Sequence, residues 1–555
     1  MLPADVQATF CSTLVDQWVR DGVTHAVVAP GSRSTPMALA LAASRELRLH
    51  VVHDERAAAF LALGIGWATG VPAVVLCTSG TAATHFHAAV AEASLSHVPM
   101  LVLTANRPPE LIDVGAPQAI DQTKLYGSAV RWFHDPGVPD LAAAQSWRPL
   151  ARQAFVAATG ADPGPVHLDL PFREPLVGTP GELPRAALGP IVASAPAVRL
   201  GTLAMALERE RGVIVAGHGV DDPTAVQRLA DATQWPILAD PRSGCRGLPS
   251  AVSAFDAILR HEDLADAHRP DVVLHLGEPP ASKVLGQWTA AAGGTQVRVL
   301  PVPGISDPWH AITHRVIAPV GELCDRLARE LRGATGTDWG DRWRRFEASA
   351  QATLANALAA DDPTTTLSEP VVARIVSEVE GNLVVASSMP VRDVEWFGTP
   401  TPRANVVSNR GANGIDGTVA TAIGVAAATG RTTTLLIGDV ALLHDATALT
   451  ALGTRGHDVR IVVNDNDGGA IFSFLPQATA LTPDRFELLF GTPHGTDLVA
   501  LAAAHGLPAR TVRTAGELRA ALAQPGPSLV RVAGDRAANV AEHRRLNDAV
   551  VAAMR

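Results

Sequence analysis

Short apolar runs along the chain alternate with longer segments in which apolar residues recur at helical spacing. In the first third, four runs rich in β-branched residues predict buried strands at 25–30, 47–52, 72–79 and 100–105. The segments between them, such as 35–46 and 54–70, have the apolar periodicity of helices. Strands and helices that alternate in this way are typical of a parallel α/β domain.

The same alternation continues to the C-terminus. Further strands are predicted at 212–220, 236–240, 271–277, 295–300, 382–388, 405–410, 432–439, 459–465 and 527–534. A Pro-, Gly- and Ala-rich stretch at 176–197 and a polar stretch at 332–340 predict connections between domains. We therefore expect an α/β protein of three Rossmann-like domains with parallel sheets, spanning residues 1–178, 198–335 and 345–555.

Composition narrows the class of protein. Hydrophobic residues make up 47% of the 555 residues and charged residues 18%, which is enough apolar material for large cores and excludes a disordered chain. Acidic residues outnumber basic ones by 55 to 45, and the formal net charge is −10. Because the sequence has no basic stripe, we expect no nucleic-acid partner.

The cysteines and the N-terminus indicate the compartment. The four cysteines lie far apart and form no CxxC pair: Cys11, Cys77, Cys245 and Cys324. This distribution argues against a disulfide scaffold and fits a reducing compartment. The N-terminus lacks the basic and apolar regions of a signal peptide, and the weakly polar stretch 417–430 is too short to span a bilayer. We expect a cytoplasmic protein without a membrane span.

Two neighbouring strand ends in the last third carry oxygen ligands. Asp439 follows Gly438 at one predicted strand end, and Asn466 and the glycine pair 468–469 follow the next strand. Open α/β sheets bind ligands at this carboxyl edge. The Asp439 carboxylate, the Asn466 amide oxygen and the Gly468 carbonyl suit Mg²⁺, whose other ligands are usually phosphate oxygens and water. Ordinary turn chemistry would explain either strand end alone, but the two together favour a metal–diphosphate site.

A second group of charged residues, Asp54-Glu55-Arg56, begins a predicted helix. Its simplest explanation is an acidic first turn that complements the helix dipole. The functional alternative is a glutamate held beside a cofactor. Thiamine diphosphate needs both kinds of group, since its diphosphate requires a metal site and its aminopyrimidine requires a carboxylate at N1′.

Six runs resemble the thiamine diphosphate-dependent enzymes: APGSRSTP (29–36), HDERAAAFLALGIG (53–66), TSGTA (78–82), TANRPPEL (104–111), SNRGANGIDGT (408–418) and NDNDGGAIF (464–472). Within that superfamily they resemble most closely the branch of 2-succinyl-5-enolpyruvyl-6-hydroxy-3-cyclohexene-1-carboxylate synthases of the menaquinone pathway. The resemblance spans the chain and is weakest in the middle domain. The metal motif is typical of the whole superfamily, whereas PGSRS, ANRPPEL and SNRGxxGIDG are more specific.

The resemblance implies cofactor contacts at matching positions. Glu55 matches the glutamate beside N1′, Ile415 matches the apolar wedge that bends the cofactor, and the metal ligands match Asp439, Asn466 and Gly468. Further cofactor contacts are implied at Thr78, Ser388, Gly438, Val440, Gly469, Ala470 and Ile471. Val440 is a departure, because the superfamily often has a third glycine at that position.

The resemblance also implies a substrate pocket, which matches Ser32, Arg33, Arg107, Gln118, Lys283, Ser388, Arg392, Arg410, Ile471 and Phe472. The implied substrates, 2-oxoglutarate and isochorismate, each carry two carboxylates. Arginine binds carboxylates through two parallel hydrogen bonds, so a pocket for these substrates needs several such cations. Each arginine alone could be a solvated surface charge. Four of them at strand ends favour a common anion pocket, as does Lys283, one of only two lysines in the chain.

The implied activity is a decarboxylation followed by carbon–carbon bond formation, with thiamine diphosphate and Mg²⁺ or Mn²⁺ as cofactors. In the resembled branch the enzyme is a homodimer, compatible with a tetramer of two dimers, and Glu55 and the metal ligands of one site come from different subunits. Two alternatives stay open. The chain could be another 2-oxo acid decarboxylase or carboligase, or a catalytically silent regulatory subunit, although the latter has no chemical need for Glu55.

Overall fold

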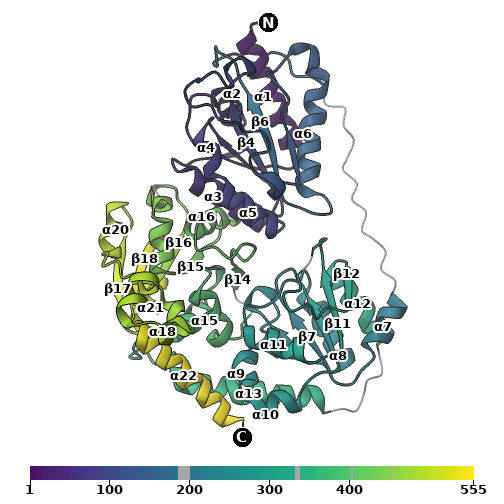
Figure 1. Cartoon of the computed structure of the whole chain (residues 1–555), viewed down its shortest axis with the longest axis vertical. Coiled ribbons are helices and arrows are strands. Elements are labelled where there is room, and N and C mark those ends of the chain that lie inside the picture. Colours follow the sequence, from purple (N-terminus) through teal and green to yellow (C-terminus); the bar gives the residue numbers. More distant parts are fainter. Residues whose placement is uncertain (186–199, 305, 332–337, 402–403, 451, 555) are drawn as a thin grey trace. The chain divides into compact units, whose positions relative to one another are not determined.

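Three parallel sheets of six strands each follow one another along the chain, with helices between most successive strands (Figure 1). The computed structural model describes residues 1–185, 200–304, 306–331, 338–401, 404–450 and 452–554. The predicted α/β fold with three parallel-sheet domains is confirmed. Within the described residues, no helix is both long enough and apolar enough to cross a membrane.

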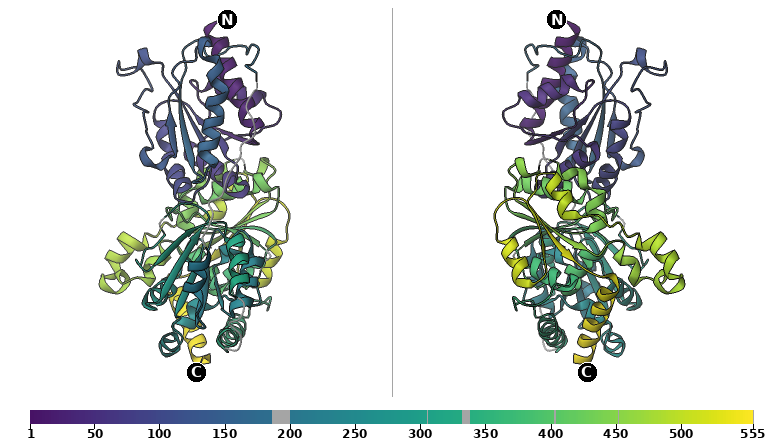
Figure 2. Two further views of the ribbon diagram at one scale, coloured as in Figure 1. Left: turned by 90° about the vertical axis from the view of Figure 1, so that its right-hand side faces the viewer. Right: turned by 90° about the vertical axis from the view of Figure 1, so that its left-hand side faces the viewer.

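The N-terminal sheet has the strand order β2-β1-β3-β4-β6-β5. Its strands are β1 (His25–Val28), β2 (Arg48–Val51), β3 (Ala73–Cys77), β4 (Met100–Asn106), β5 (Trp132–His134) and β6 (Pro165–Pro171). The helices are α1 (Pro3–Arg20), α2 (Thr35–Ala43), α3 (Glu55–Thr69), α4 (Thr81–His85), α5 (His87–Leu95) and α6 (Ala144–Thr159). Helices α1 and α6 pack together beside the sheet, and their apolar faces form one core with its strands (Figure 2).

The central sheet has the order β12-β11-β10-β7-β8-β9. Its strands are β7 (Gly212–Ala216), β8 (Ile237–Ala239), β9 (Ala251–Val252), β10 (Val272–Leu276), β11 (Thr295–Leu300) and β12 (His314–Ile317). Its helices are α7 (Leu200–Leu207), α8 (Pro223–Thr233), α9 (Phe255–Leu259), α10 (Glu262–Ala267), α11 (Lys283–Ala291) and α12 (Val320–Glu330), and α13 (Trp339–Leu358) follows.

The C-terminal sheet has the order β14-β13-β15-β16-β18-β17. Its strands are β13 (Gly381–Val385), β14 (Ala404–Val407), β15 (Thr433–Gly438), β16 (Val459–Asp465), β17 (Ala509–Val512) and β18 (Ser528–Ala533). The helices are α14 (Glu369–Val376), α15 (Met389–Phe397), α16 (Thr418–Thr429), α17 (Asp439–His444), α18 (Gln477–Ala480), α19 (Pro483–Phe486), α20 (Leu498–Ala504), α21 (Ala515–Leu522) and α22 (Arg536–Ala553). A 3₁₀ turn, η7 (Ala470–Phe474), follows β16.

The N-terminal and C-terminal sheets share one topology. In each, the first strand lies between the second and the third, so the connections leave that strand in opposite directions. These switch points lie between β1 and β3 and between β13 and β15. Ligands of open α/β sheets bind in the crevice at such points.

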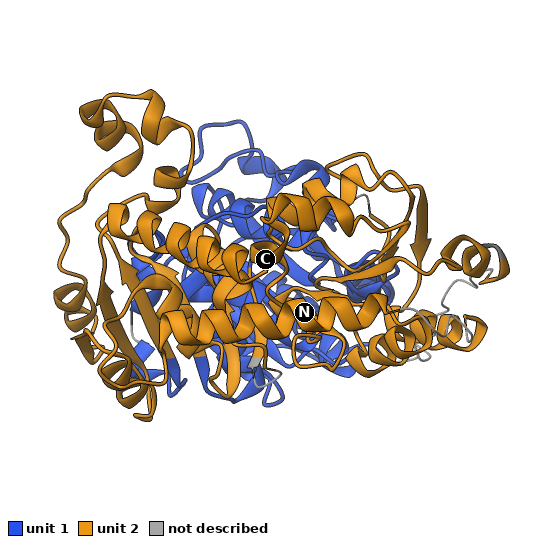
Figure 3. Cartoon of the chain, turned by 90° about the horizontal axis from the view of Figure 1, so that it is seen from below, with its two compact units in different colours: residues 1–193, 409–433, 441–459 blue, residues 194–408, 434–440, 460–555 orange. Residues whose placement is uncertain are grey.

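Contacts divide the chain into two compact units (Figure 3). The first contains residues 1–193, 409–433 and 441–459, and the second contains residues 194–408, 434–440 and 460–555. Helix α16 therefore belongs with the N-terminal sheet, where it packs directly on α3. Their backbones approach so closely that a Cβ on Gly64 would lie 2.2 Å from the Thr421 carbonyl oxygen, and one on Gly424 would lie 2.2 Å from that of Leu61.

The structure corrects the strand predictions in two respects. Five strands, β5, β6, β9, β12 and β17, were not predicted. The run 47–52 was predicted to be buried, but β2 is a largely exposed edge strand because it pairs with β1 alone. The predicted connections at 176–197 and 332–340 lie partly outside the described residues. The domain boundaries 1–178, 198–335 and 345–555 stay a prediction.

Candidate active site

The predicted metal ligands meet at the carboxyl ends of the neighbouring strands β15 and β16, next to the C-terminal switch point. Asp439 begins α17 directly after β15 and is only 2% exposed. Its Oδ2 accepts hydrogen bonds from the backbone N–H groups of Asn466, at 3.1 Å, and Gly468, at 3.0 Å. Burial raises the pKa of Asp439, and hydrogen bonds from the backbone N–H groups of Gly468 and Val440 partly oppose the shift. The structure thus brings together the two strand ends that the sequence singled out.

Asn466 presents an oxygen without a protein partner. Its side-chain Nδ2 donates to Glu369 Oε1 at 2.9 Å, while its buried Oδ1 accepts no hydrogen bond from any described residue. A buried amide oxygen without a donor is costly unless a ligand satisfies it. Asn466 Oδ1 and the Asp439 carboxylate therefore fit a divalent cation that prefers oxygen ligands.

Gly468 occupies a position that only glycine can take. Its φ is +142°, and a Cβ there would lie 1.8 Å from the Gly491 carbonyl oxygen. Its own carbonyl accepts the Ala470 N–H at 3.0 Å, which leaves a second lone pair for a metal ion. Gly469 follows in the same turn and donates its N–H to the Gly491 carbonyl oxygen at 2.9 Å.

The sequence did not single out Asp465 or His494 at this place. Single ligand atoms of Asp439, Asp465 and His494 lie within 4.8 Å of one another. Thr496 N–H donates to His494 Nδ1 at 3.0 Å, so a neutral ring carries its proton on Nε2, which lies 3.4 Å from Asp439 Oδ2. Asp465 was visible in the NDND run, but no local pattern marked His494.

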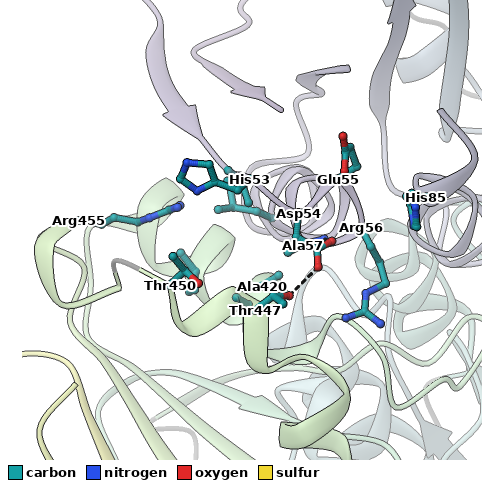
Figure 4. Close-up of a pocket in the computed structure, with 14 residues that line it drawn as sticks. His53, Asp54, Glu55, Arg56, Ala57, His85, Ala420, Thr447, Thr450 and Arg455 are labelled. Carbon is teal, nitrogen blue, oxygen red and sulfur yellow. Dashed lines mark hydrogen bonds between the residues drawn. The ribbon is translucent and has the colours of Figure 1, made fainter. Parts of the chain in front are cut away.

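Glu55 begins α3 in the first unit. Asp54, not Glu55, caps the helix by accepting the Ala57 N–H, and its other oxygen accepts the Thr447 hydroxyl at 2.7 Å. In Figure 4, Asp54 points toward Thr447, whereas Glu55 projects from the other side of the helix. Both line a cavity of about 570 Å³. Within the described residues, the Glu55 carboxylate has no hydrogen-bond donor, and so it is available to a ligand.

The loop with Arg410 and Ile415 is held by the N-terminal domain. Glu92 of α5 is 3% exposed, and its two carboxylate oxygens accept the N–H groups of Gly411, at 2.8 Å, and Ala412, at 2.7 Å. Arg410 and Ile415, both half-buried, lie on either side of this anchored stretch. The structure thus places both residues on a loop fixed near α5 in the first unit.

Ser32, Arg33 and Thr78 meet at the N-terminal switch point, after β1 and β3. The Arg33 N–H donates to Thr78 Oγ1 at 3.3 Å. The close approach requires Gly31, where a Cβ would lie 2.3 Å from that of Thr78. The Arg33 guanidinium donates to the Phe172 carbonyl and to Glu174, and Ser32 is exposed beside it.

Arg107 and Gln118 lie close to this point. Arg107 follows β4, and its guanidinium donates to the Pro117 carbonyl oxygen at 2.8 Å. Burial, and next the charge of Arg107, lower the pKa of Arg33. The exposed Glu174 is the carboxylate that opposes this effect. Gln118 Nε2 donates to the Ser79 carbonyl oxygen at 3.0 Å, which ties its loop to the end of β3. The pair of guanidinium groups is suited to an anionic ligand.

Ser388, Arg392 and Lys283 all lie in the second unit. Ser388 follows β13 with φ +72° and precedes α15, and its carbonyl oxygen accepts a hydrogen bond from Arg392 at 2.5 Å. Burial lowers the pKa of Arg392. Lys283 is exposed at the first turn of α11, and the Ala281 N–H just before it donates to Glu395 of α15 at 2.7 Å. The structure therefore brings the start of α11 beside the helix of Arg392.

The remaining predicted residues surround the metal-binding turn. Gly438 and Val440 flank Asp439, and a Cβ on Gly438 would meet nothing within 4 Å. Ala470 is buried at the start of η7, where Ile471 and Phe472 are half-buried. The Phe472 ring lies 5.2 Å from that of Phe490. The apolar residues Ile471 and Phe472 thus directly follow the metal-binding turn at Gly468 and Gly469.

Comparison with known families matches all three parts of the chain. Residues 9–125 match the N-terminal TPP binding domain of thiamine pyrophosphate enzymes, residues 195–381 match their middle domain, and residues 395–532 match their C-terminal TPP binding domain. Both sets of predicted cofactor residues lie in or beside the two TPP binding domains. The comparison supports thiamine diphosphate as the cofactor.

Similar curated proteins cover nearly the whole chain. A protein of Myxococcus xanthus is 41% identical over 98% of this chain and 97% of its own length. One from Rubrobacter xylanophilus is 44% identical over 96% of each chain, and one from Thermobifida fusca is 42% identical over 98% of each. All three are named 2-succinyl-5-enolpyruvyl-6-hydroxy-3-cyclohexene-1-carboxylate synthase. With its parallel-sheet domains and matching strand-end residues, this chain belongs to that family of thiamine diphosphate-dependent enzymes.

Proposed function

We propose that the enzyme decarboxylates 2-oxoglutarate and joins the remaining four-carbon unit to isochorismate by 1,4-addition. The product is 2-succinyl-5-enolpyruvyl-6-hydroxy-3-cyclohexene-1-carboxylate, an intermediate of menaquinone biosynthesis. One observation carries this choice of substrates: the guanidinium groups of Arg33 and Arg107 lie close together. Among the described residues, no buried carboxylate balances their two positive charges. Such a pair favours substrates with several carboxylates over a small apolar 2-oxo acid.

The substrate residues divide between the two compact units. In the first unit, Ser32, Arg33, Arg107 and Gln118 would bind carboxylate and hydroxyl oxygens, with Arg410 on its anchored loop. In the second unit, Lys283, Ser388 and Arg392 would bind further anionic oxygens, and Ile471 and Phe472 would exclude water from the reacting carbons.

Thiamine diphosphate supplies, when bound, the electron sink for decarboxylation and carbon–carbon bond formation. The Glu55 carboxylate would hold a proton at N1′ of its aminopyrimidine, and Thr78 and Ile415 would contact the organic part. Asp439, Asn466 and the Gly468 carbonyl would hold Mg²⁺, or Mn²⁺ in its place, because all three offer oxygen ligands. Gly438, Val440, Gly469, Ala470 and Ile471 would line the diphosphate.

We further propose a homodimer, with a tetramer of two dimers as a compatible larger assembly. Glu55 of one subunit would serve the metal site of the other. A cytoplasmic enzyme is consistent with four free, buried cysteines, since a reducing compartment keeps such thiols unpaired.

The first experiment is a spectrophotometric assay of isochorismate consumption by the purified protein with thiamine diphosphate, Mg²⁺ and 2-oxoglutarate. Each component is omitted in turn. Loss of absorbance only in the complete mixture would support the proposed reaction. Release of carbon dioxide from 2-oxoglutarate without loss of isochorismate would favour a different acceptor. If cofactor binds but neither substrate reacts, the assignment fails in favour of a silent cofactor-binding subunit.

The same assay tests the metal. Chelation with EDTA should abolish turnover, and Mg²⁺ or Mn²⁺ should restore it. Asp439→Asn removes the charged ligand and should weaken metal-dependent cofactor binding at least as strongly as it lowers activity. An Asp439→Asn variant with wild-type metal affinity would contradict the ligand set.

A further inference from the structure

A buried polar chain connects Asn466 to the C-terminal helix. Asn466 Nδ2 donates to Glu369 Oε1 at 2.9 Å, and Glu369 is 7% exposed at the start of α14. The Glu369 carboxyl group lies beside Asp393 of α15, which is fully buried. Asp393 Oδ1 lies 2.7 Å from His543 Nε2, and His543 Nδ1 lies 2.8 Å from the Asn539 carbonyl oxygen. The chain thus joins α14, α15 and α22 behind the metal-binding turn.

The contacts of His543 show which atoms of this series of hydrogen bonds donate and which accept. His543 Nδ1 must donate, because a carbonyl oxygen can only accept, and Nε2 faces a carboxylate. Asp393 beside it raises the pKa of His543 against the effect of burial. Glu369 Oε1 accepts the hydrogen bond of the Asn466 amide and lies 2.9 Å from Asn466 Nδ2.

We propose that Glu369 is a positioning residue, which holds the Asn466 amide so that its Oδ1 faces the metal-binding turn and its nitrogen faces the protein. An asparagine can present either its oxygen or its NH₂ group to a cation, and only the oxygen is a ligand. Asn466 Oδ1 is buried and unpaired among the described residues, whereas its nitrogen is satisfied by Glu369. This inference rests on the proposed role of Asn466 as a metal ligand.

Partners behind a metal ligand typically change metal affinity about 10–100-fold when they are removed. Glu369→Ala should therefore raise the apparent Kd for Mg²⁺, measured by titrating the apoprotein with Mg²⁺ at fixed thiamine diphosphate and following intrinsic fluorescence. Glu369→Gln should stay close to wild type, because glutamine keeps an acceptor for Asn466 and a donor for Asp393. If Glu369→Ala does not fold, Glu369→Met is measured in its place.

A matched control separates the orientation of the Asn466 amide from the stability of α14. Ser368 caps the same helix, since its Oγ accepts the Val371 N–H, but it is not bonded to Asn466. Ser368→Ala should lower thermal stability and leave the Mg²⁺ affinity unchanged. A second test uses Asn466→Asp, whose two equivalent oxygens need no orientation. In that background, Glu369→Ala should no longer weaken Mg²⁺ binding.

The possible results separate a failure of the positioning role of Glu369 from a failure of the proposed function. If the wild-type protein binds no thiamine diphosphate with Mg²⁺, the proposed function fails. If the wild type binds both and Glu369→Ala binds Mg²⁺ equally well, the positioning role is overturned while the function stands. An equal loss of affinity in the wild-type and Asn466→Asp backgrounds also overturns it, because that result indicates general damage to α14.

Discussion

The two outer sheets have the same strand order but present opposite chemistry at their switch points. Between β1 and β3, the N-terminal sheet presents the cationic Arg33 beside Thr78, with Arg107 nearby. Between β13 and β15, the C-terminal sheet presents the buried carboxylate of Asp439. The shared topology creates the crevice, and a few residues after each strand decide whether it suits an anion or a cation.

The central sheet differs from both outer sheets, because the crevice at its switch point is closed. Its switch point lies between β7 and β10, and the loops after these strands pack on each other. A Cβ on Gly217 would lie 1.5 Å from the Glu278 carbonyl oxygen, and the Glu278 N–H donates to the His218 carbonyl oxygen at 2.7 Å. The glycine after β7 therefore permits close backbone packing.

The largest expected effect in the N-terminal half is the loss of the Glu55 carboxylate. Glu55→Gln keeps the side-chain volume but removes the charge, so kcat should fall by about 10²–10³-fold, within the range of acid–base contributions. Cofactor affinity and thermal unfolding should change little. Turnover, fluorescence titration and circular dichroism check the three parts, and near-wild-type turnover would exclude Glu55 as the N1′ partner.

Next in size is the effect of the anion site. Arg107→Lys retains the charge but loses the planar fork, and Arg107→Gln loses both. Since a hydrogen bond to a charged group contributes about 1.5–3 kcal/mol, kcat/KM for the dicarboxylate substrates should fall about 10–100-fold in Arg107→Gln and less in Arg107→Lys. Arg173→Lys, at a half-exposed arginine paired with Glu110, is the control and should have no effect. Equal kinetics in all variants would remove Arg107 from the pocket.

The next prediction compares a glycine of the closed central crevice, Gly217, with a glycine of the metal-binding turn, Gly468. Gly217→Ala forces the β7 and β10 loops apart and should lower thermal stability while thiamine diphosphate affinity stays unchanged. Gly468→Ala, where φ is +142° and a Cβ would approach the Gly491 carbonyl oxygen, should weaken cofactor binding as well. Calorimetry and cofactor titration separate the two results. Weaker cofactor binding in Gly217→Ala would show that the central crevice takes part in the site.

The smallest effect concerns the edge of the N-terminal sheet, where His25 Nδ1 lies 3.1 Å from His50 Nε2. Burial, and next the charge of Arg48, lower the pKa of His25 to about 4. Burial, and next the interaction with His25, lower the pKa of His50 to about 3. An unfolded histidine titrates near 6.5, so stability from the neutral pair is complete above that pH and is lost as the pH falls toward 4. His50→Gln should reduce the drop in Tm between pH 7.5 and 5 by about 2–4 °C. An equal drop in both proteins would contradict this assignment.

Much of the fold could be predicted because buried parallel strands form continuous apolar runs. Runs such as Ala73–Cys77 and Val459–Asp465 stand out for this reason. Short edge strands lack the pattern: β9 has two residues and β17 is half-exposed, and neither was predicted. The buried interior strand β6 was also missed, because His167 and Asp169 interrupt its apolar run. The run of β2 has the right residues, but its exposure depends on which strand becomes the edge, and this is a tertiary property.

Some residues of the candidate site could likewise be predicted from the sequence, and others could not. Asp439 and Asn466 could be found because each follows a strand, and strand ends meet at one edge of a sheet. Glu369 could not, because Ser368-Glu369-Pro370 has the ordinary pattern of a helix start, and its bond to Asn466 joins residues 97 positions apart. His494 likewise lies in a loop without periodicity. Residues that orient a ligand from behind leave no local pattern.

The contact between α3 and α16 has a consequence for exchanging parts between relatives. Helix α16 lies in the C-terminal part of the sequence, yet it fits against α3 with almost no space between the backbones at Gly64 and Gly424. A chimera joined at a boundary between sequence domains would inherit one helix from each parent, and any side chain bulkier than glycine would separate them. Exchange therefore has to move α3 and α16 together, as a single inherited pair.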